Sequence, residues 1–413
     1  MAMKIKRIVK NIVYRLNIII VFICLHTICR ELLTKEIWLI SEKRTEARDN
    51  GYHLFKYLVE LNDKNLCPVY VIDKKSADYQ KIKSLGKIIQ YDSLEHFLYY
   101  IAATFRIGGQ VQGGKPYIDT AKQATLKLLR NRKQIHFFIK HGIAKDDIPS
   151  AYDYRQAGYD VMFCGSEKEY EYYKNRYNYP DNRIRCPGLC RFDNLLSEDI
   201  TEDMILVMPT YRKWLQPSDS SKEANEEEKQ RFRESEYFRK WYELLVNKEL
   251  TEELTKSGYR LIFYPHYTMQ PFIETFQSEE IPPCITIASR KEYDVQNLLM
   301  RTKLLITDYS SVFFDVSYMG KCIDFYQFDE KKYREEHYSL GWFDYKKDAM
   351  GPIFTEEDKL VDDIVQRLEN GFEMEGKYKS RIDNLYKNID RFNCKRVYET
   401  IKLYRGIKFE NNN

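Results

Sequence analysis

The chain of 413 residues is too long for one hydrophobic core, and its 43% apolar and 31% charged residues are typical of folded domains, so we expect two of them. The formal net charge of +4 is too small to indicate nucleic-acid binding, and no interleaved basic and aromatic tract supports that function. Nine scattered cysteines fit reduced thiols in the cytoplasm, and the close pair Cys186 and Cys190 lacks the second pair or histidine of a zinc site.

Residues 1–33 have a composition of their own. The segment is rich in lysine and arginine up to Arg30 and has no acidic residue before Glu31. Its apolar run Leu16–Leu25 is too short to span a bilayer and has no small-residue cleavage site after it. A basic, apolar helix would lie among the headgroups of an anionic membrane, although an ordinary packed helix is the alternative. The sequence therefore predicts a peripheral, monotopic attachment to the cytoplasmic face of the cell membrane.

Residues 34–200 alternate short apolar runs with amphipathic segments. Helical spacing is found over 51–62 and 93–104. Buried strands are predicted at 37–40, 69–72, 88–89, 135–139 and 161–164. This alternation indicates a parallel sheet with helices on both faces, which is a Rossmann-like domain.

The alternation starts again over residues 201–385, after an acidic linker at 197–203. Strands are predicted at 205–208, 260–264, 285–287, 304–306 and 322–326. The charge-dense stretch 218–234 is predicted to be a mobile surface loop, and 386–413 a C-terminal helix and tail. We expect an α/β protein whose two doubly wound domains face each other across a cleft, with the ligand at the carboxyl ends of strands.

The strongest local signal for a ligand is the segment 304–320. An apolar strand ends at Thr307, and an amphipathic helix is expected to begin near Ser310. Thr307, Ser310 and Ser311 would then gather where free N–H groups and the helix dipole favour an anion such as pyrophosphate. A plain helix cap by Asp308 or Ser310 explains the same pattern without a ligand, and the local sequence does not decide between them.

Two histidines also follow predicted strands. His266 comes after the strand that starts at Arg260, where it could donate to a phosphate or protonate a leaving group, although a lone histidine is more often structural. His141 follows the strand 135–139, and Gly142 allows a tight turn and a close ligand approach. One histidine from each domain fits acid–base chemistry on a phosphoryl group between them.

Arg212 follows the first strand of the second domain, and its planar guanidinium suits a phosphate; a salt-bridged arginine is the alternative. No P-loop is present, and the glycine pairs 108–109 and 113–114 do not form a dinucleotide fingerprint, so no redox cofactor is expected. No carboxylate cluster calls for a bound metal, while a solvated Mg²⁺ remains open.

Together these segments resemble the CDP-glycerol glycerophosphotransferase family, which includes teichoic acid primases and polymerases. The likeness extends over roughly residues 35–400 in the same order, and Thr307–Ser311 is its most specific part. The other matching pieces are Trp38–Glu42, Glu46–Phe55, Lys140–Asp147, Pro187–Asn194, Met208–Arg212, Phe263–His266, Phe328–Asp329 and Gly341–Tyr345.

The resemblance implies a GT-B-type fold with an acceptor domain, a CDP-donor-binding domain and a monotopic N-terminal attachment. It implies transfer of glycerol phosphate or ribitol phosphate from CDP-glycerol or CDP-ribitol to a hydroxyl of a lipid-linked or polymeric glycan acceptor, with release of CMP. The product would be a teichoic acid-like or capsular polymer.

The resemblance also implies roles for particular residues. His141 is the expected catalytic base on the acceptor side, and His266 is the second catalytic residue, beside the donor phosphates. The expected donor-binding residues are Thr210, Arg212, Thr307, Asp308, Ser310, Ser311 and Asp329.

Two other functions stay open: a GT-B glycosyltransferase that uses a nucleotide sugar, and a non-catalytic subunit that organises polymer assembly at the membrane. One departure from the family bears on the acceptor. Many teichoic acid polymerases have His-Gly-Thr-Pro where this chain has His141-Gly-Ile-Ala144, so acceptor contacts should differ. The sequence does not identify the polyol, the acceptor, primase or polymerase action, or the oligomeric state.

Overall fold

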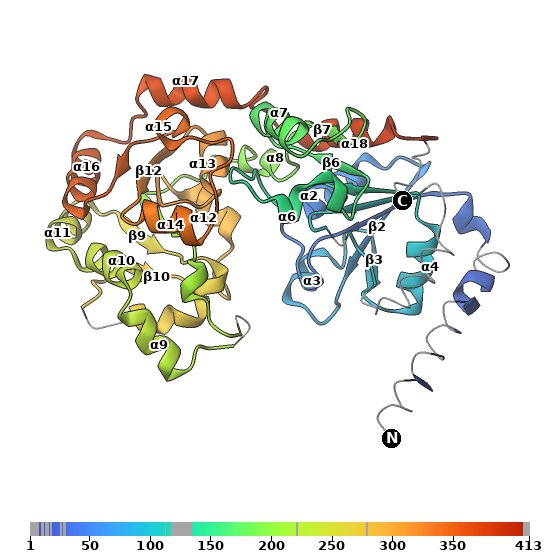
Figure 1. Ribbon diagram of the computed structural model, residues 1–413, viewed down its shortest axis with the longest axis horizontal. Coiled ribbons are helices and arrows are strands. Elements are labelled where there is room, and N and C mark those ends of the chain that lie inside the picture. The colour runs from blue at the N-terminus through green and yellow to red at the C-terminus, as the bar shows by residue number, and fades with distance from the viewer. Residues whose placement is uncertain are drawn as a thin grey trace. The chain divides into compact units, whose positions relative to one another are not determined.

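The structure, a computed structural model, describes residues 8–9, 12, 16, 19–24, 27, 30–111, 113–116, 134–219, 222–277 and 280–407. It divides into two compact units (Figure 1). Unit 1 comprises residues 1–143, 149–194 and 390–413, and unit 2 comprises 144–148 and 195–389. Most of the predicted membrane-associating segment 1–33 lies outside the described residues.

Unit 1 contains a seven-stranded parallel sheet in the order β3-β2-β1-β4-β5-β6-β7. The strands are β1 (Glu36–Ser41), β2 (Leu66–Ile72), β3 (Lys87–Gln90), β4 (Phe105–Gly108), β5 (Ile135–Phe138), β6 (Val161–Phe163) and β7 (Ile184–Arg185). The helices are η1 (Arg30–Leu33), α2 (Asn50–Leu61), α3 (Ala77–Ile82), α4 (Leu94–Ala102), α6 (Pro149–Tyr152), η2 (Tyr154–Gln156), α7 (Glu167–Arg176), α8 (Phe192–Leu195) and α18 (Asn393–Lys402). The five strands predicted here are confirmed, and β4 and β7 are additional.

Helices cover both faces of this sheet, because neighbouring residues of a buried strand point to opposite sides. In β1, Trp38 and Ile40 pack in a core with residues of α2 and α18. Ile37 and Leu39 pack in a second core with residues of α4. The sheet of unit 1 is therefore doubly wound, as the strand and helix alternation predicts.

Unit 2 contains a six-stranded parallel sheet in the order β10-β9-β8-β11-β12-β13. The strands are β8 (Met204–Val207), β9 (Arg260–Phe263), β10 (Ile285–Ile287), β11 (Leu304–Thr307), β12 (Cys322–Tyr326) and β13 (Ile353–Phe354). The helices are η3 (Lys213–Leu215), α9 (Glu226–Arg233), α10 (Glu236–Val246), α11 (Lys248–Ser257), η4 (Tyr267–Phe276), α12 (Val295–Arg301), α13 (Phe313–Tyr318), α14 (Glu330–Glu336), α15 (Tyr345–Asp348), α16 (Glu357–Asn370) and α17 (Gly376–Leu385). All five predicted strands are confirmed, and β13 is additional.

Both sheets follow the strand order of a Rossmann fold, in which the third, second and first strands precede the fourth and fifth. The direction of winding reverses between the first and fourth strands, which are β1 and β4 in unit 1 and β8 and β11 in unit 2. Ligands of such sheets bind outside the carboxyl ends of the strands at this switch point. The fold therefore directs attention to the segments that follow β8 and β11.

Two local predictions are wrong. The stretch 218–234, expected to be a loop, contains α9, which starts with a capping box between Asn225 and Glu228 and buries Phe232 in the core. The helix expected from Ser310 begins at Phe313 and has only six residues. The many charged residues of 218–234 led to the prediction of a loop instead of α9. A turn at Ser311 and Val312 precedes α13, so this helix begins later than predicted.

Candidate functional site

The carboxyl ends of β8 and β11 are neighbours at the switch point of unit 2, because these two strands pair directly. Thr307, the last residue of β11, donates its hydroxyl hydrogen to the backbone oxygen of Met208 at 2.7 Å. Its side chain is fully buried. Thr307 therefore joins the two strand ends, and its contact with the donor stays a prediction.

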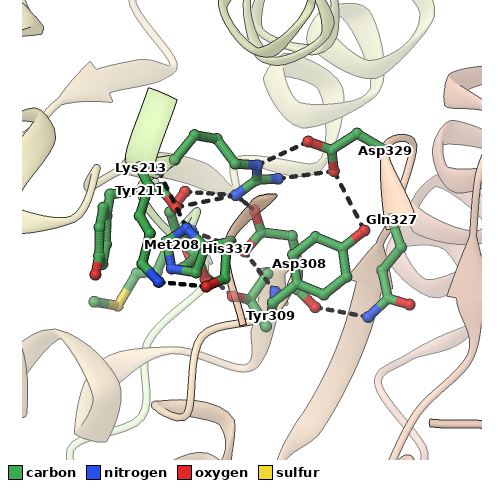
Figure 2. A network of polar contacts seen from close by, with 11 residues as sticks. Met208, Tyr211, Lys213, Asp308, Tyr309, Gln327, Asp329 and His337 are labelled. Carbon is green, nitrogen blue, oxygen red and sulfur yellow. Dashed lines mark hydrogen bonds and ion pairs between the residues drawn. The ribbon is translucent and has the colours of Figure 1, made fainter. Parts of the chain in front are cut away.

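Arg212 is fully buried and holds two carboxylates, Asp308 and Asp329, which are labelled in Figure 2. Its Nε and Nη2 donate to the two oxygens of Asp329, at 2.7 and 3.0 Å. Its Nη1 donates to the backbone oxygen of Thr210 at 2.8 Å and lies 2.9 Å from Oδ2 of Asp308. Burial opposes the charged form, but Asp308 and then Asp329 raise the pKa of Arg212. All three nitrogens have protein partners, so Arg212 positions the two carboxylates, which is the salt-bridged alternative that the sequence left open.

The carboxylates continue this network to the neighbouring loops (Figure 2). Asp308 Oδ1 accepts hydrogen bonds from the backbone nitrogens of Thr210 and Tyr309, at 2.7 and 2.6 Å. The Tyr309 hydroxyl donates to Asp329 Oδ1 at 3.2 Å, and Gln327 Nε2 donates to the backbone oxygen of Asp308 at 2.9 Å. The structure thus brings Thr210, Asp308 and Asp329 together in one buried polar network, which connects the loops after β8, β11 and β12. We call these residues and Arg212 the buried lattice.

The surface of this lattice is the short loop between β11 and α13. Ser310 is half-buried and Ser311 is exposed. The backbone nitrogens of Ser310, Ser311 and Val312 donate no hydrogen bond to any residue that the structure describes. Because α13 is short, these N–H groups and the two hydroxyls, rather than a long helix dipole, are what the loop offers to an anion.

His266 follows β9 in the same unit. Its Nδ1 accepts a hydrogen bond from the backbone nitrogen of Thr268 at 3.3 Å, so the neutral ring carries its hydrogen on Nε2. The ring stacks on Tyr211, with 4.8 Å between the ring centroids. Tyr211 directly precedes Arg212, so His266 borders the loop that the buried lattice holds in place. This position suits the predicted donation of a hydrogen bond to a phosphate oxygen.

A segment that the sequence analysis assigns to the first domain is part of unit 2. Residues 144–148 are bound there through the Trp342 indole, which donates to the backbone oxygen of Ala144 at 2.8 Å, and through an antiparallel bridge between Asp147 and Ser339. A side chain at Gly341 would place a Cβ 2.3 Å from the backbone oxygen of Lys145, so only glycine fits. Only two residues separate this segment from His141.

His141 itself lies in unit 1, where the side chains of Asn50 and Arg191 hold the backbone of residues 140 and 141. Asn50 is buried; its Nδ2 donates to the backbone oxygen of Lys140 at 3.0 Å, and its Oδ1 accepts from the backbone nitrogen of Arg191 at 3.0 Å. The Arg191 guanidinium donates to the backbone oxygen of His141 and to Asp49 Oδ1, the latter at 2.9 Å. Sequence reasoning did not identify Asn50 or Arg191, although both lie within segments that match the family.

Lys140 gives the same loop a buried ionic anchor. Its backbone is left-handed, with a φ of 56°, and its ammonium group pairs with Glu169 while both side chains are fully buried. Tyr173 accepts a hydrogen bond from the ammonium at 3.2 Å, and the ring of Tyr152 lies 4.7 Å from it. Burial opposes the charge, but the Glu169 carboxylate raises the pKa of Lys140. The residue before His141 is thus fixed as a cation.

The His141 side chain is exposed to solvent, yet its pKa is below the ordinary value. The protein packed around the ring disfavours the charged imidazolium first, and the cations Lys140 and Arg191 act in the same direction. Asp49 opposes them. A lowered pKa keeps His141 neutral near pH 7, the form in which a histidine accepts a proton.

Within the described ranges, no group of three or more His, Cys, Asp or Glu residues lies in an arrangement that could hold a metal ion. In the same part of the chain, no helix is long and apolar enough to cross a bilayer.

Two parallel sheets of Rossmann order, with a polar loop at the switch point of the second, define a protein of the GT-B-like class. The chain belongs to the CDP-glycerol:poly(glycerophosphate) glycerophosphotransferase family, whose model matches residues 22–403. It is 31% identical over 371 residues, or 89% of its length, to the minor teichoic acid biosynthesis protein GgaB of Bacillus subtilis, of which it spans 40%. It is 24% identical over 337 residues to a teichoic acid poly(glycerol phosphate) polymerase of Bacillus spizizenii, with 76% of this chain and 79% of that protein covered.

Solved structures agree on the fold. The wall teichoic acid polymerase TagF superposes with a TM-score of 0.64 at 17% identity, over 97% of this chain and 96% of that one. A putative UDP-N-acetylglucosamine 2-epimerase from Listeria monocytogenes superposes with a TM-score of 0.54 at 12% identity, over 91% and 99% of the two chains. At these identities the likeness establishes the GT-B-like architecture alone.

Proposed function

We propose that this enzyme transfers glycerol phosphate, or ribitol phosphate, from a CDP-polyol to a hydroxyl of a growing teichoic acid-like or capsular polymer and releases CMP. Family membership supports the reaction class, and the names of the relatives support a teichoic acid product. A TagF variant was soaked with CDPG, which supports CDP-glycerol as the first donor to test.

The observation that carries the proposal is the loop after β11. Three backbone N–H groups and two hydroxyls, at Ser310, Ser311 and Val312, are available at the switch point of a Rossmann-ordered sheet. The buried Arg212, Asp308 and Asp329 lattice holds this loop without using those donors. Preorganised neutral donors suit a diphosphate, since they need not be reordered when negative charge develops.

In the proposed reaction, the acceptor hydroxyl oxygen attacks the phosphorus distal to cytidine, and the bond from that phosphorus to the bridging oxygen breaks. His141 takes the hydroxyl proton, and CMP leaves with the bridging oxygen. Such transfer depends mainly on positioning and charge stabilisation. The Nε2–H of His266 and the loop at Ser310 and Ser311 would stabilise the charge on the leaving phosphate.

Attachment to an anionic membrane surface is part of the proposal. The exposed apolar residues of the N-terminal segment recur at helical spacing: Ile8, Val9, Ile12, Leu16, Ile19, Ile20 and Ile23. An exposed apolar face accompanied by basic residues binds anionic headgroups. Co-sedimentation with anionic vesicles, and its loss in an Ile12→Asp and Ile19→Asp double variant, would test this. Equal binding of both proteins would count against it.

The central experiment incubates the purified chain with a polyol-phosphate acceptor and CDP-glycerol, CDP-ribitol or UDP-sugars in turn, and measures released nucleotide and product mass. Release of CMP with product growth by one polyol phosphate is expected. Release of UDP would indicate the alternative, a nucleotide-sugar glycosyltransferase. No release from any donor would favour a non-catalytic assembly role.

A further inference from the structure

Two arginines lie near the switch point of unit 2, and they differ in how their donors are used. Every nitrogen of Arg212 has a partner, as described above. Arg334, on α14, pairs through Nη1 with Asp146 at 2.7 Å, but its Nε and Nη2 are buried without a hydrogen-bond partner among the described residues. Buried N–H groups are nearly always satisfied in folded proteins. Arg334 therefore has unused donors where the fold would normally supply an acceptor.

Two further unpartnered groups belong to this cluster. His337 and Tyr345 are both 5% exposed, and the His337 Nε2 and Tyr345 hydroxyl have no hydrogen-bond partner within the described ranges. His337 Nδ1 accepts from the backbone nitrogen of Lys213 at 3.2 Å, so its neutral ring carries hydrogen on Nε2. Burial first, and then the Lys213 charge, lower the pKa of His337 to about 3, which keeps that form at neutral pH. The unused groups are thus all able to donate.

Short contacts connect these groups. The Arg334 guanidinium carbon lies 5.9 Å from the ring centre of Tyr345 and 5.4 Å from that of Tyr333. Tyr333 stacks on His337, with 4.6 Å between ring centroids. The Lys145 ammonium lies 5.5 Å from the ring centre of Tyr345 and is almost fully buried. We call Lys145, Arg334, His337 and Tyr345 the donor cluster.

Acceptors are scarce in the donor cluster. Asp146 is the carboxylate that pairs with both cations, at 2.5 Å from Lys145 and 2.7 Å from Arg334. The nearby Asp308 and Asp329 direct their oxygens to Arg212 and to the loop after β11. Among the described residues joined by these contacts, and with the exposed Lys213, there are four cations and three carboxylates: Lys145, Arg212, Lys213 and Arg334 against Asp146, Asp308 and Asp329. An anion rich in acceptor oxygens would complete both the charge and the hydrogen bonds.

We propose that the donor cluster is a phosphate-binding subsite, separate from the diphosphate loop at Ser310 and Ser311, which receives the phosphodiester next to the acceptor hydroxyl. This inference rests on the proposed transferase function. The two non-bridging oxygens of a phosphodiester can accept hydrogen bonds from Arg334, the His337 Nε2 and the Tyr345 hydroxyl, and its two ester oxygens add weaker acceptors that a carboxylate lacks.

The chain path favours the acceptor rather than the donor as the source of this phosphate. Lys145 and Asp146 come from the segment that follows His141 after two residues, and His141 is the proposed base for the acceptor hydroxyl. Three Cα–Cα steps from His141 to Ala144 reach at most about 11 Å. A polyol-phosphate acceptor has a phosphodiester one polyol away from its reactive hydroxyl, which is a spacing of the same order.

The test uses the full chain, CDP-glycerol and two synthetic acceptors that end in glycerol, one with a phosphodiester next to the terminal glycerol and one with a neutral ether in its place. The key variant is Tyr345→Phe, because it removes one hydroxyl that has no partner and so should leave stability unchanged. Its KM for the phosphodiester acceptor should rise about tenfold, and that of Arg334→Gln about a hundredfold, with little change for the ether acceptor or for CDP-glycerol. Lys332→Gln, an equal charge change on the exposed side of α14, is the control and should behave as the wild type.

Unchanged acceptor KM in Tyr345→Phe and Arg334→Gln would overturn the subsite, as would a rise confined to CDP-glycerol, which would assign the cluster to the donor. Wild-type enzyme that releases no CMP with either acceptor, from CDP-glycerol or from CDP-ribitol, would instead refute the proposed function. A second readout does not need turnover: inorganic phosphate should raise the melting temperature of the wild type and of Lys332→Gln, and less so that of Arg334→Gln. Equal rises in all three proteins would also overturn the subsite.

Discussion

The two histidines proposed to react are held in different ways. In unit 1, the loop of His141 is fixed by a fully buried Lys140 and Glu169 pair and by hydrogen bonds from Asn50 and Arg191 to its backbone. In unit 2, His266 makes hydrogen bonds with backbone atoms of Pro209, Thr268 and Met269, and its ring stacks on Tyr211. The first arrangement therefore includes a buried ion pair, whereas the second consists of backbone hydrogen bonds and an aromatic stack.

The difference indicates how each loop should respond to substitution. Removing one member of a buried ion pair leaves an uncompensated charge, so damage to the His141 loop should be large and should reach the whole unit. Removing a stacking partner loses only about 0.5–1.5 kcal/mol, so damage to the His266 loop should be local. Substitutions in the two loops therefore test this contrast.

The largest effect is expected when either ring is removed. His141→Ala and His266→Ala should each lower kcat by roughly 10²–10⁴-fold, because each loses a proton acceptor or a hydrogen-bond donor in the transition state. If both rings serve the same step, the double variant should be little slower than the single ones. Steady-state CMP release measures this, with circular dichroism to show that the fold is retained. Near-normal turnover in either single variant would remove that histidine from the mechanism.

The next effect is on stability. Glu169→Gln leaves the buried ammonium of Lys140 without its carboxylate, and should lower the free energy of unfolding by about 3–5 kcal/mol. Glu171→Gln, on the same helix but exposed, is the matched control and should change it by no more than about 0.5 kcal/mol. Urea unfolding of both proteins provides the comparison. Equal losses would show that the buried pair is not what anchors the His141 loop.

Much of the fold follows from local pattern, and its exceptions have local causes. Ten strands are predicted from apolar runs because a strand buried on both faces is a nearly continuous apolar segment. In β4, Arg106 and Gly108 interrupt that signal, and β7 and β13 have only two residues each. Strands of two to four residues are too short for a hydrophobic pattern to be recognised in the sequence.

The candidate site is only partly readable from sequence, because its chemistry depends on distant partners. The hydroxyl loop at Ser310 and Ser311 is visible as a local motif. The local sequence does not show whether an arginine is available to bind a phosphate, because its partners are distant. Arg212 donates to Asp329, 117 residues later, and Arg334 donates to Asp146, 188 residues earlier. Sequence reasoning therefore left Arg212 open between a phosphate ligand and a salt bridge, and it did not single out Arg334.

A smaller effect should follow from loss of the aromatic stack. Tyr211→Leu removes the ring that lies 4.8 Å from His266 and the hydroxyl contact with Tyr338 at 3.0 Å. We expect kcat/KM to fall by about three- to tenfold, in line with the stacking energy. Tyr211→Phe keeps the ring and serves as the control. If Tyr211→Phe lost as much activity as Tyr211→Leu, the hydroxyl rather than the stack would be what supports His266.

The smallest effect is a shift in pH dependence, and its sign is specific to the His141 loop. His141 must be neutral to accept a proton, so activity should fall as the pH drops through its lowered pKa. Asp49 raises this pKa and Arg191 lowers it. Asp49→Asn should therefore move the acid limb of the pH–rate profile to lower pH, and Arg191→Gln should move it to higher pH.

Arg191→Lys keeps the positive charge and should leave the limb in place, which separates electrostatics from the hydrogen bond to the His141 backbone. The shifts should be small because the exposed ring is screened by water and salt. NMR titration of the His141 ring measures the same pKa without turnover. If the pKa of His141 measured by NMR shifted in opposite directions in Asp49→Asn and Arg191→Gln, the electrostatic effect of the loop would be confirmed. If the pH–rate profile did not move in the same variants, a group other than His141 would be the base.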